Sequence, residues 1–222
     1  MELLNVVRAR STWLFDLGEL NPKGKSVFPE LLEWLKDLYN FSKAPASATD
    51  LDETKALAFL GGTFQVREEI FIDVDLRIYN DGVIADTKSS TDDSDAILAD
   101  VLKSAAMEFK LNYHPDALKR ILYVSEINVT TPHSLERLNP KLNAVAAKIS
   151  SALSELGVQP FELASIAFWP DQVTSSPVAH FRLERKLHVP YSHNRYYSIA
   201  PLATPKHLEV LSDIEKIASQ KS

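Results

Sequence analysis

The chain of 222 residues contains no cysteine and only six glycines. The lack of cysteine excludes disulfides, thiolate chemistry and zinc sites built from cysteine, and it suits a reducing compartment. The scarcity of glycine disfavours a loop that cradles phosphates. No Gly-x-Gly-x-x-Gly, Walker A or Gly-x-Ser-x-Gly motif occurs. These absences remove the commonest signatures of nucleotide-binding proteins and serine hydrolases.

Long hydrophobic runs and excess positive charge are also missing. No apolar stretch approaches the roughly 18 residues that span a bilayer, and the N-terminus, MELLNVVRARSTW, lacks the pattern of a signal peptide. The formal net charge is −6, which disfavours non-specific attraction to nucleic acid or anionic lipid. We therefore expect a cytoplasmic protein without a membrane partner.

The clearest local signal is residues 70–88, IFIDVDLRIYNDGVIADTK, which predict a long β-hairpin. Asp81-Gly82 between two alternating runs is typical of a two-residue turn. That turn predicts a register in which Arg77 lies opposite Asp86 and Asp75 lies opposite Lys88. The alternation places the aliphatic residues on a core face and the charged residues on the other.

Strands and helices alternate irregularly along the rest of the chain. We therefore predict an α+β fold, with a mixed, largely antiparallel sheet built around the 70–88 hairpin and helices packed on it. The chain is long enough to bury a sizeable core. We expect a single domain over residues 1–222, with a weak possible subdivision near 130–140.

The charged face of the hairpin is the first candidate site. Asp73, Asp75 and Asp86 could hold Mg²⁺, which prefers oxygen ligands, and Lys88 could orient the attacking water on a phosphodiester. The acid on one strand and Asp86-Thr87-Lys88 on the next resemble the PD-(D/E)xK nuclease pattern, over roughly residues 28–129. The resemblance implies Asp75, Asp86 and Lys88 as catalytic residues, Asp73, Asp75 and Asp86 as metal ligands, and nucleic acid as the substrate.

Ion pairing explains the same residues without a metal. In the predicted register, Arg77–Asp86 and Asp75–Lys88 form two cross-strand pairs, each worth roughly 0.2–1 kcal/mol. An arginine beside Asp86 would compete with a cation for it. We favour this interpretation, and with it the expectation of no metal and no cofactor.

Aspartates at 92, 93, 95 and 100 form an acidic cluster after the hairpin. They lack the central glycine and closing glutamate of an EF-hand. Their place after Ser90 and Thr91 is typical of a helix N-terminus, where serine or threonine caps free amides and acids meet the positive end of the helix dipole.

The second candidate site is the aromatic segment His188–Tyr197. Tyrosine and arginine are enriched at binding hot spots, because they combine large contact area with polar reach. The candidate binding residues are Tyr191, His193, Arg195, Tyr196 and Tyr197. The alternative is that these tyrosines cover the core and keep only their hydroxyls in water.

Two further elements bear on binding. Residues 178–187 predict a strand with one polar face, which could pair with a partner if it forms a sheet edge. A helix from Pro140 to Leu156 is predicted to turn an apolar face inward, formed by Leu142, Val145, Ala146, Ile149 and Leu153. The leading hypothesis is a binding or interaction module that assembles with itself or another protein; the alternative is a Mg²⁺-dependent nuclease.

Overall fold

The computed structural model describes residues 1–222 except 23, 25–26, 46–55, 158, 172–178 and 221–222. The strands are β1 (Glu2–Leu14), β2 (Leu57–Arg67), β3 (Ile70–Tyr79), β4 (Gly82–Thr87), β5 (Arg120–Thr130), β6 (Ser165–Phe168), β7 (Phe181–Arg185) and β8 (Arg195–Ala200). The α-helices are α1 (Leu17–Leu20), α2 (Phe28–Leu38), α3 (Thr91–Phe109), α4 (Asn143–Ala152) and α5 (Thr204–Ser219). None of these helices is long and apolar enough to cross a membrane.

The contacts gather in two compact units. The N-terminal unit comprises residues 6–125 and 202–204, and the C-terminal unit comprises residues 1–5, 126–201 and 205–222. Strands β1 and β5 contribute residues to both units, and the change-over on β5 lies between Ser125 and Glu126. The single domain, with its possible subdivision near 130–140, stays a prediction.

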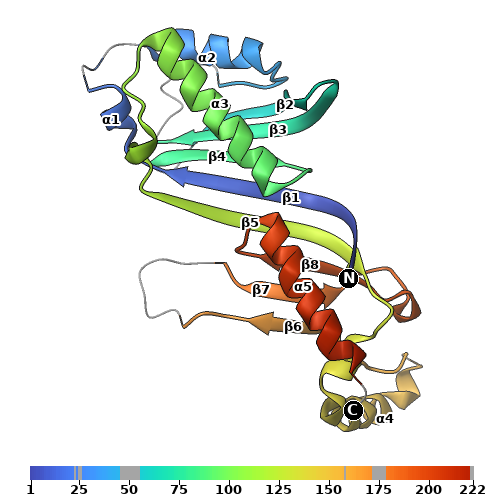
Figure 1. Ribbon diagram of the computed structural model, residues 1–222. Helices are drawn as coiled ribbons and strands as arrows, with labels where there is room; N and C mark the ends of the chain where they lie inside the picture. The colour runs from blue at the N-terminus through green and yellow to red at the C-terminus, as the bar shows by residue number, and fades with distance from the viewer. Residues whose placement is uncertain (23, 25–26, 46–55, 158, 172–178, 221–222) are drawn as a thin grey trace. The chain divides into compact units, whose positions relative to one another are not determined.

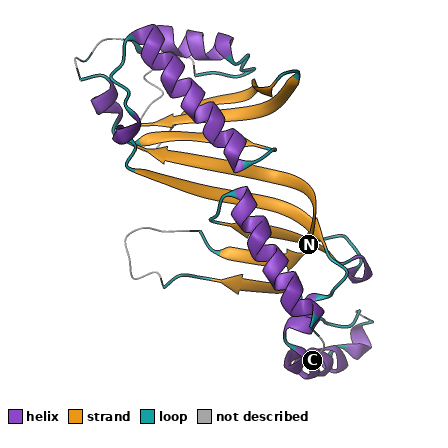
Figure 2. Cartoon of the chain, viewed as in Figure 1, coloured by secondary structure: helices purple, strands orange, loops and turns teal. Residues whose placement is uncertain are grey.

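In the N-terminal unit, an antiparallel sheet is covered on one face by helices. Strand β3 pairs with β2 and β4, and β4 pairs with β1. Helix α3 lies across these strands with α2 beside it (Figure 1, Figure 2). The side chains between helices and sheet form one buried core, which includes Leu35, Phe59, Leu76, Ala85 and Leu98. The predicted α+β class, with the hairpin inside an antiparallel sheet, is confirmed.

The hairpin has a different register from the predicted one. Tyr79 pairs with Gly82, so the turn is Asn80-Asp81 and Asp75 lies directly opposite Asp86. Gly82 is needed for the close approach of β1 rather than for the turn, because a Cβ there would lie 2.3 Å from the carbonyl oxygen of Trp13. The register shifts by two residues, so each side chain keeps its predicted face while its opposite neighbour changes.

Helix α3 is fixed at its N-terminal end by the predicted cap and by one unexpected carboxylate. The Ser90 hydroxyl accepts a hydrogen bond from the amide of Asp93 at 3.1 Å. Asp95 instead turns toward the sheet. It accepts hydrogen bonds from Ser11 Oγ, from Trp13 Nε1 at 2.7 Å and from Tyr123 Oη at 2.8 Å. This carboxylate therefore ties the helix to β1 and β5.

In the C-terminal unit, β7 pairs antiparallel with β6 on one side and β8 on the other, and α5 lies across these strands (Figure 1). The strand predicted at 178–187 is therefore an interior strand, so the condition that it forms a sheet edge is not met. The last strand in the order is β6.

Helix α4 does not bury its apolar face. It forms within the predicted 140–156 segment, but Leu142, Val145 and Ile149 are exposed and no residue of α4 is buried. The inward orientation predicted for this face is wrong. Periodicity shows which side of a helix is apolar, but it does not show whether another element covers that side.

Candidate functional site

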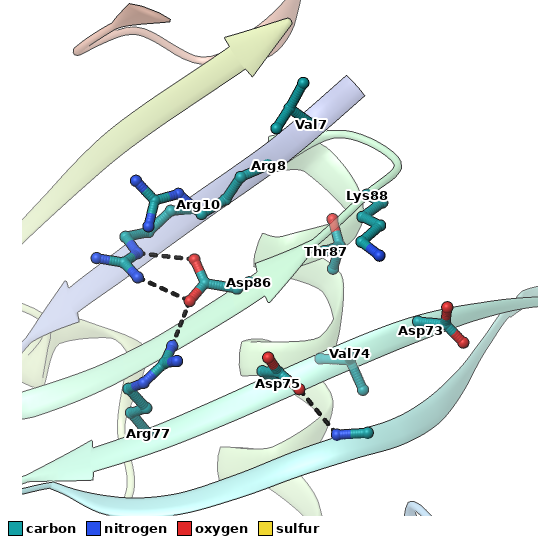
Figure 3. Close-up of a pocket in the computed structure, with 11 residues that line it drawn as sticks. Val7, Arg8, Arg10, Asp73, Val74, Asp75, Arg77, Asp86, Thr87 and Lys88 are labelled. Atoms are coloured by element: carbon teal, nitrogen blue, oxygen red, sulfur yellow. Dashed lines mark hydrogen bonds and ion pairs between the residues drawn. The ribbon is translucent and has the colours of Figure 1, made fainter. Parts of the chain in front are cut away.

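The charged residues of the hairpin line a hollow of about 440 Å³ on the face of the N-terminal sheet away from α3 (Figure 3). The alternation of β1, β3 and β4 brings them together. The charged lining residues are Arg8, Arg10, Asp73, Asp75, Arg77, Asp86 and Lys88. The sequence placed Asp73, Asp75, Asp86 and Lys88 on one charged face, but it missed the arginines from β1.

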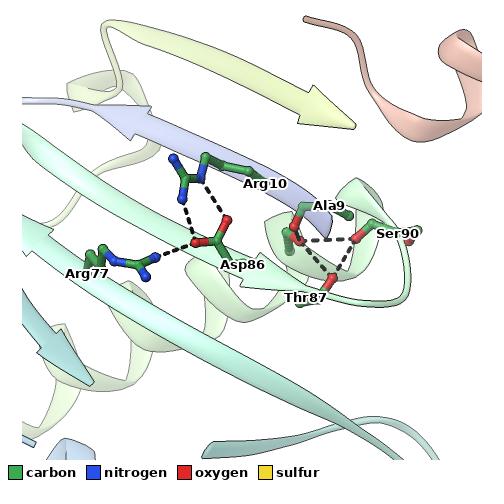
Figure 4. Close-up of polar contacts among 7 residues, drawn as sticks. Ala9, Arg10, Arg77, Asp86, Thr87 and Ser90 are labelled. Carbon is green, nitrogen blue, oxygen red and sulfur yellow. Dashed lines mark hydrogen bonds and ion pairs between the residues drawn. The ribbon is translucent and has the colours of Figure 1, made fainter. Parts of the chain in front are cut away.

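Asp86 is held by two arginines. Arg10 donates from Nε to Oδ1 at 2.7 Å and from Nη2 to Oδ2 at 2.8 Å, and Arg77 donates from Nη1 to Oδ2 (Figure 4). Partial burial by itself would raise the pKa of Asp86. The hydrogen bonds and charges of Arg10 and Arg77 outweigh it and hold that pKa below its ordinary value.

The other predicted ligands do not join Asp86 around a common point. Asp75 accepts a hydrogen bond at 2.8 Å from the amide of Gly61, which has a positive φ in the β-bulge of β2. Asp73 is exposed, and the predicted Asp75–Lys88 pair does not form. Among the described residues, no group of three or more histidine and acidic side chains could hold a metal ion.

Thr87, between Asp86 and Lys88, also borders the hollow, but its hydroxyl bonds toward the start of α3 and fixes the end of β4. Its hydroxyl lies 3.1 Å from that of Ser94 and donates to the carbonyl oxygen of Ser90 at 3.2 Å, while Ser94 also donates to the carbonyl of Ala9 at 2.9 Å (Figure 4). Structural contacts therefore account for Asp86 and Thr87. The metal hypothesis requires Arg77 to turn away from Asp86, and the observed pairing is the opposite.

This arrangement predicts a result for metal binding. Calorimetric titration with millimolar Mg²⁺ should give the same heats for the native protein and for Asp86→Asn, because guanidinium groups already bond both oxygens of Asp86. A binding isotherm that Asp86→Asn abolishes would contradict this prediction. Arg77→Met is the matched variant: if Arg77 alone blocked a latent site, that substitution would create Mg²⁺ binding.

The aromatic segment predicted as a binding loop divides into a turn and a strand. Tyr191 and His193 lie in a 3₁₀ turn and are exposed, whereas Arg195, Tyr196 and Tyr197 belong to β8. Tyr196 is fully buried, and burial raises its pKa. Its hydroxyl accepts a hydrogen bond from the amide of Leu135 at 3.2 Å. Tyr197 donates to Glu126 at 2.8 Å. Tyr196 is thus a core residue, and the exposed part of the segment centres on Tyr191.

A buried arginine, Arg185, positions Tyr191, although its sequence motif carries no recognised binding signature. Arg185 donates to the carbonyl oxygen of Tyr191 at 2.9 Å, to Ser134 Oγ at 2.9 Å and to Glu162 at 3.0 Å. Its guanidinium lies 4.2 Å from the centre of the Tyr191 ring, at cation–π distance. The sequence holds one signal for this burial. Arg185 follows Phe181 and Leu183 at a spacing of two residues, so it points to the same core face of the strand.

Tyr191 and Glu162 border a pocket of about 740 Å³, which Phe161, Ala164 and Pro190 also line. We call it the Tyr191 pocket. Residues 161–164 run directly into β6, so the pocket lies at the N-terminal end of that strand.

The outward side of β6, with Trp169 after it, forms what we call the β6 edge. The amide of Arg185 donates to the carbonyl oxygen of Ala164, and Ile166 pairs with Leu183. Because backbone groups alternate in direction along an antiparallel strand, those of Ser165 and Ala167 point away from β7. At the other end of the strand, Phe168 and Trp169 are 63% and 62% exposed. Trp169 stacks on His180, with ring centres 4.2 Å apart.

The comparisons with known proteins add no functional assignment. No family model matches the chain, and no curated protein is similar to it in sequence. Among solved structures, it is similar to the TBP of Methanococcus jannaschii with 10% identity and a TM-score of 0.38, over 98% of this chain and 97% of that one. At this level, the similarity supports no inference about function.

Proposed function

We propose that this protein is a binding module without catalytic activity, and that its contact surface is the β6 edge together with the Tyr191 pocket. The observation that carries the proposal is the outward direction of the backbone groups of Ser165 and Ala167, between a pocket and two exposed aromatic rings. The ligand class that fits is an extended polypeptide, which adds as a strand to a sheet edge and places a side chain in a pocket.

The composition of β6 supports this proposal. Proteins protect sheet edges with lysine, proline, bulges or a covering element, because an open edge pairs readily with other chains. Residues 163–169, LASIAFW, contain no charge and no proline. Exposed aromatic residues such as Phe168, Trp169 and Tyr191 are the type enriched at protein interfaces.

The nuclease alternative is not carried forward, because the two arginines occupy Asp86. A cytoplasmic location remains part of the proposal and rests on the sequence features described above. The expected partners are polypeptides: another protein or a second copy of this chain.

Selection from a random-peptide display library on the intact protein tests this function. Enriched peptides should bind the native protein and lose about tenfold or more in affinity for Ala167→Pro, because proline removes the outward amide. That substitution spares the ladder with β7, which uses the neighbouring residues.

Ala167→Val is the matched control, since it adds side-chain bulk at the same position but keeps the amide. Peptides should bind it with nearly native affinity, and both variants should show the native circular dichroism spectrum. Failure to enrich any peptide on protein kept below the concentration at which it self-associates, or equal binding to native protein and Ala167→Pro, would refute the proposed contact surface.

A further inference from the structure

We infer that the occupant of the β6 edge is the β6 edge of a second copy of this chain, so that the protein forms a two-fold symmetric dimer through antiparallel pairing of the two strands. This inference rests on the proposed function and names its partner. It starts from the two ends of β6, which differ: the Tyr191 pocket lies at the N-terminal end, and the exposed rings of Phe168 and Trp169 lie at the C-terminal end.

The direction of the backbone groups fixes the register of this pairing. Only residues whose amide and carbonyl groups point outward can exchange hydrogen bonds with a second strand, and in β6 these are Ser165 and Ala167. Both are used in each copy when Ser165 pairs with the partner's Ala167 and Ala167 with the partner's Ser165. Ile166 then lies on the two-fold axis, opposite the partner's Ile166.

This register brings the unlike ends of the two strands together. Counting outward from Ile166, Ala164 lies opposite the partner's Phe168. Ala164 lines the Tyr191 pocket. Directly opposed residues point to the same face of a sheet. Ala164 lies opposite Arg185 across β6 and β7, so both point to one face. The partner's Phe168, opposite Ala164, points to that face too. That is the face on which Arg185 holds Tyr191 and Glu162. Each copy thus supplies a ring to the pocket of the other.

Charge and area favour a second copy as the occupant. If a charged strand paired with its own copy, like charges would lie side by side and repel. Residues 163–169 carry no charge, so self-pairing meets no such repulsion. Phe161, Phe168, Trp169 and Tyr191 are each exposed. If each ring has about 150–250 Å² of surface and about half of it is exposed, complete coverage of eight rings contributes at most roughly 600–1,000 Å². Together with two paired strands, this approaches the roughly 1,200 Å² of a specific interface. A closed two-fold arrangement also satisfies both edges at once.

Sedimentation velocity of the full-length chain over the micromolar range tests the dimer. The native protein and Ala167→Val should sediment as a dimer, whereas Ala167→Pro and Phe168→Glu should weaken dimerisation by about tenfold or more. Leu187→Glu is the control for added charge, because Leu187 is highly exposed and lies outside the β6 edge; it should remain dimeric.

The absence of cysteine from the chain allows a test of the register itself. Residues in a non-hydrogen-bonded antiparallel pair have Cα atoms about 4.5 Å apart, within the range of a disulfide. Ile166→Cys should therefore form a covalent dimer under mild oxidation, and Ser165→Cys, whose counterpart is two positions away, should form far less.

The outcomes separate this inference from the proposed function. A native protein that is monomeric throughout, while library peptides still bind in an Ala167-dependent manner, would overturn self-pairing and leave the proposed function standing. A dimer that persists in Ala167→Pro and cross-links no faster at residue 166 than at 165 would place the interface elsewhere and would also overturn the inference.

Discussion

Replacing Asp95 by alanine is expected to lower the free energy of unfolding by about 4 kcal/mol. The substitution removes the acceptor for Ser11, Trp13 and Tyr123 in one step. A hydrogen bond to a charged group contributes roughly 1.5–3 kcal/mol, and a buried donor left without a partner adds its desolvation cost. Ser11 and Trp13 are both buried, so water cannot fully replace the lost bonds. Urea unfolding followed by fluorescence measures the change.

Two further variants distinguish the loss of the Asp95 hydrogen bonds from the loss of any acidic residue near the N-terminus of α3. Asp92→Ala changes an exposed acid one turn earlier on α3 and should cost only a few tenths of a kcal/mol through the helix dipole. Asp95→Asn keeps one oxygen acceptor but removes the charge, so it should fall between native protein and alanine. Burial, together with the hydrogen bond and charge of Asp95, raises the pKa of Tyr123 to about 12; this pKa should fall in both Asp95 variants, because the charge is lost while burial remains. Equal stability of Asp95→Ala and Asp92→Ala would rule out a role for Asp95 in anchoring α3.

The second large expected effect is a loss of folding stability at acidic pH. His207 is fully buried on α5, its Nε2 lies 2.8 Å from Ser198 Oγ, and its ring packs edge-on against Phe181. Its Nδ1 is buried without a hydrogen-bond partner in the described part of the chain. Burial lowers the pKa of His207 from 6.5 to about 4. The unfolded chain therefore takes up the proton first, and this contribution to stability is present above pH 6.5 and lost as the pH falls toward 4.

The expected loss is about 3 kcal/mol near pH 4 relative to neutral pH. His207→Leu replaces the titrating group with an apolar side chain of similar size. The stability difference between native protein and His207→Leu should thus shift by that amount between pH 7.5 and pH 4, as measured by urea unfolding at each pH. Asp86, whose pKa is also lowered, is present in both proteins and cancels. His193→Gln, at an exposed histidine, serves as the control, and a pH profile that His207→Leu leaves unchanged would exclude His207 as the origin.

The hairpin shows how far the sequence carries a structural prediction. Alternation along residues 70–88 was sufficient to predict the strands, the core face and the charged face. The register depended on a fact outside the hairpin, the close approach of β1 to Gly82. The Arg77–Asp86 pair therefore forms diagonally rather than between opposed residues, and Arg10 joins it from a strand 76 positions away. Local pattern cannot supply such a partner.

The proposed binding surface shows the same limit. Tyr196 and Tyr197 have the composition of a contact loop, but the strand that contains them turns Tyr196 into the core. The identity of the edge strand depends on strand order, which non-local pairing decides. Sequence patterns located a strand near 178–187, which contains β7. They did not show that β6, and not β7, is the last in the sheet.

The division of β1 between the two units constrains how this polypeptide can be dissected and how it matures. Residues 1–5 belong with segments that begin at residue 126, and Asn5 is bonded at 3.0 Å to Asn128, 123 positions later. No single cut therefore yields two complete halves; a fragment ending at residue 125 carries five residues whose partners it lacks. During synthesis on the ribosome, the opening of β1 must wait, unpaired, until β5 has emerged, whereas the rest of β1 can already join the hairpin.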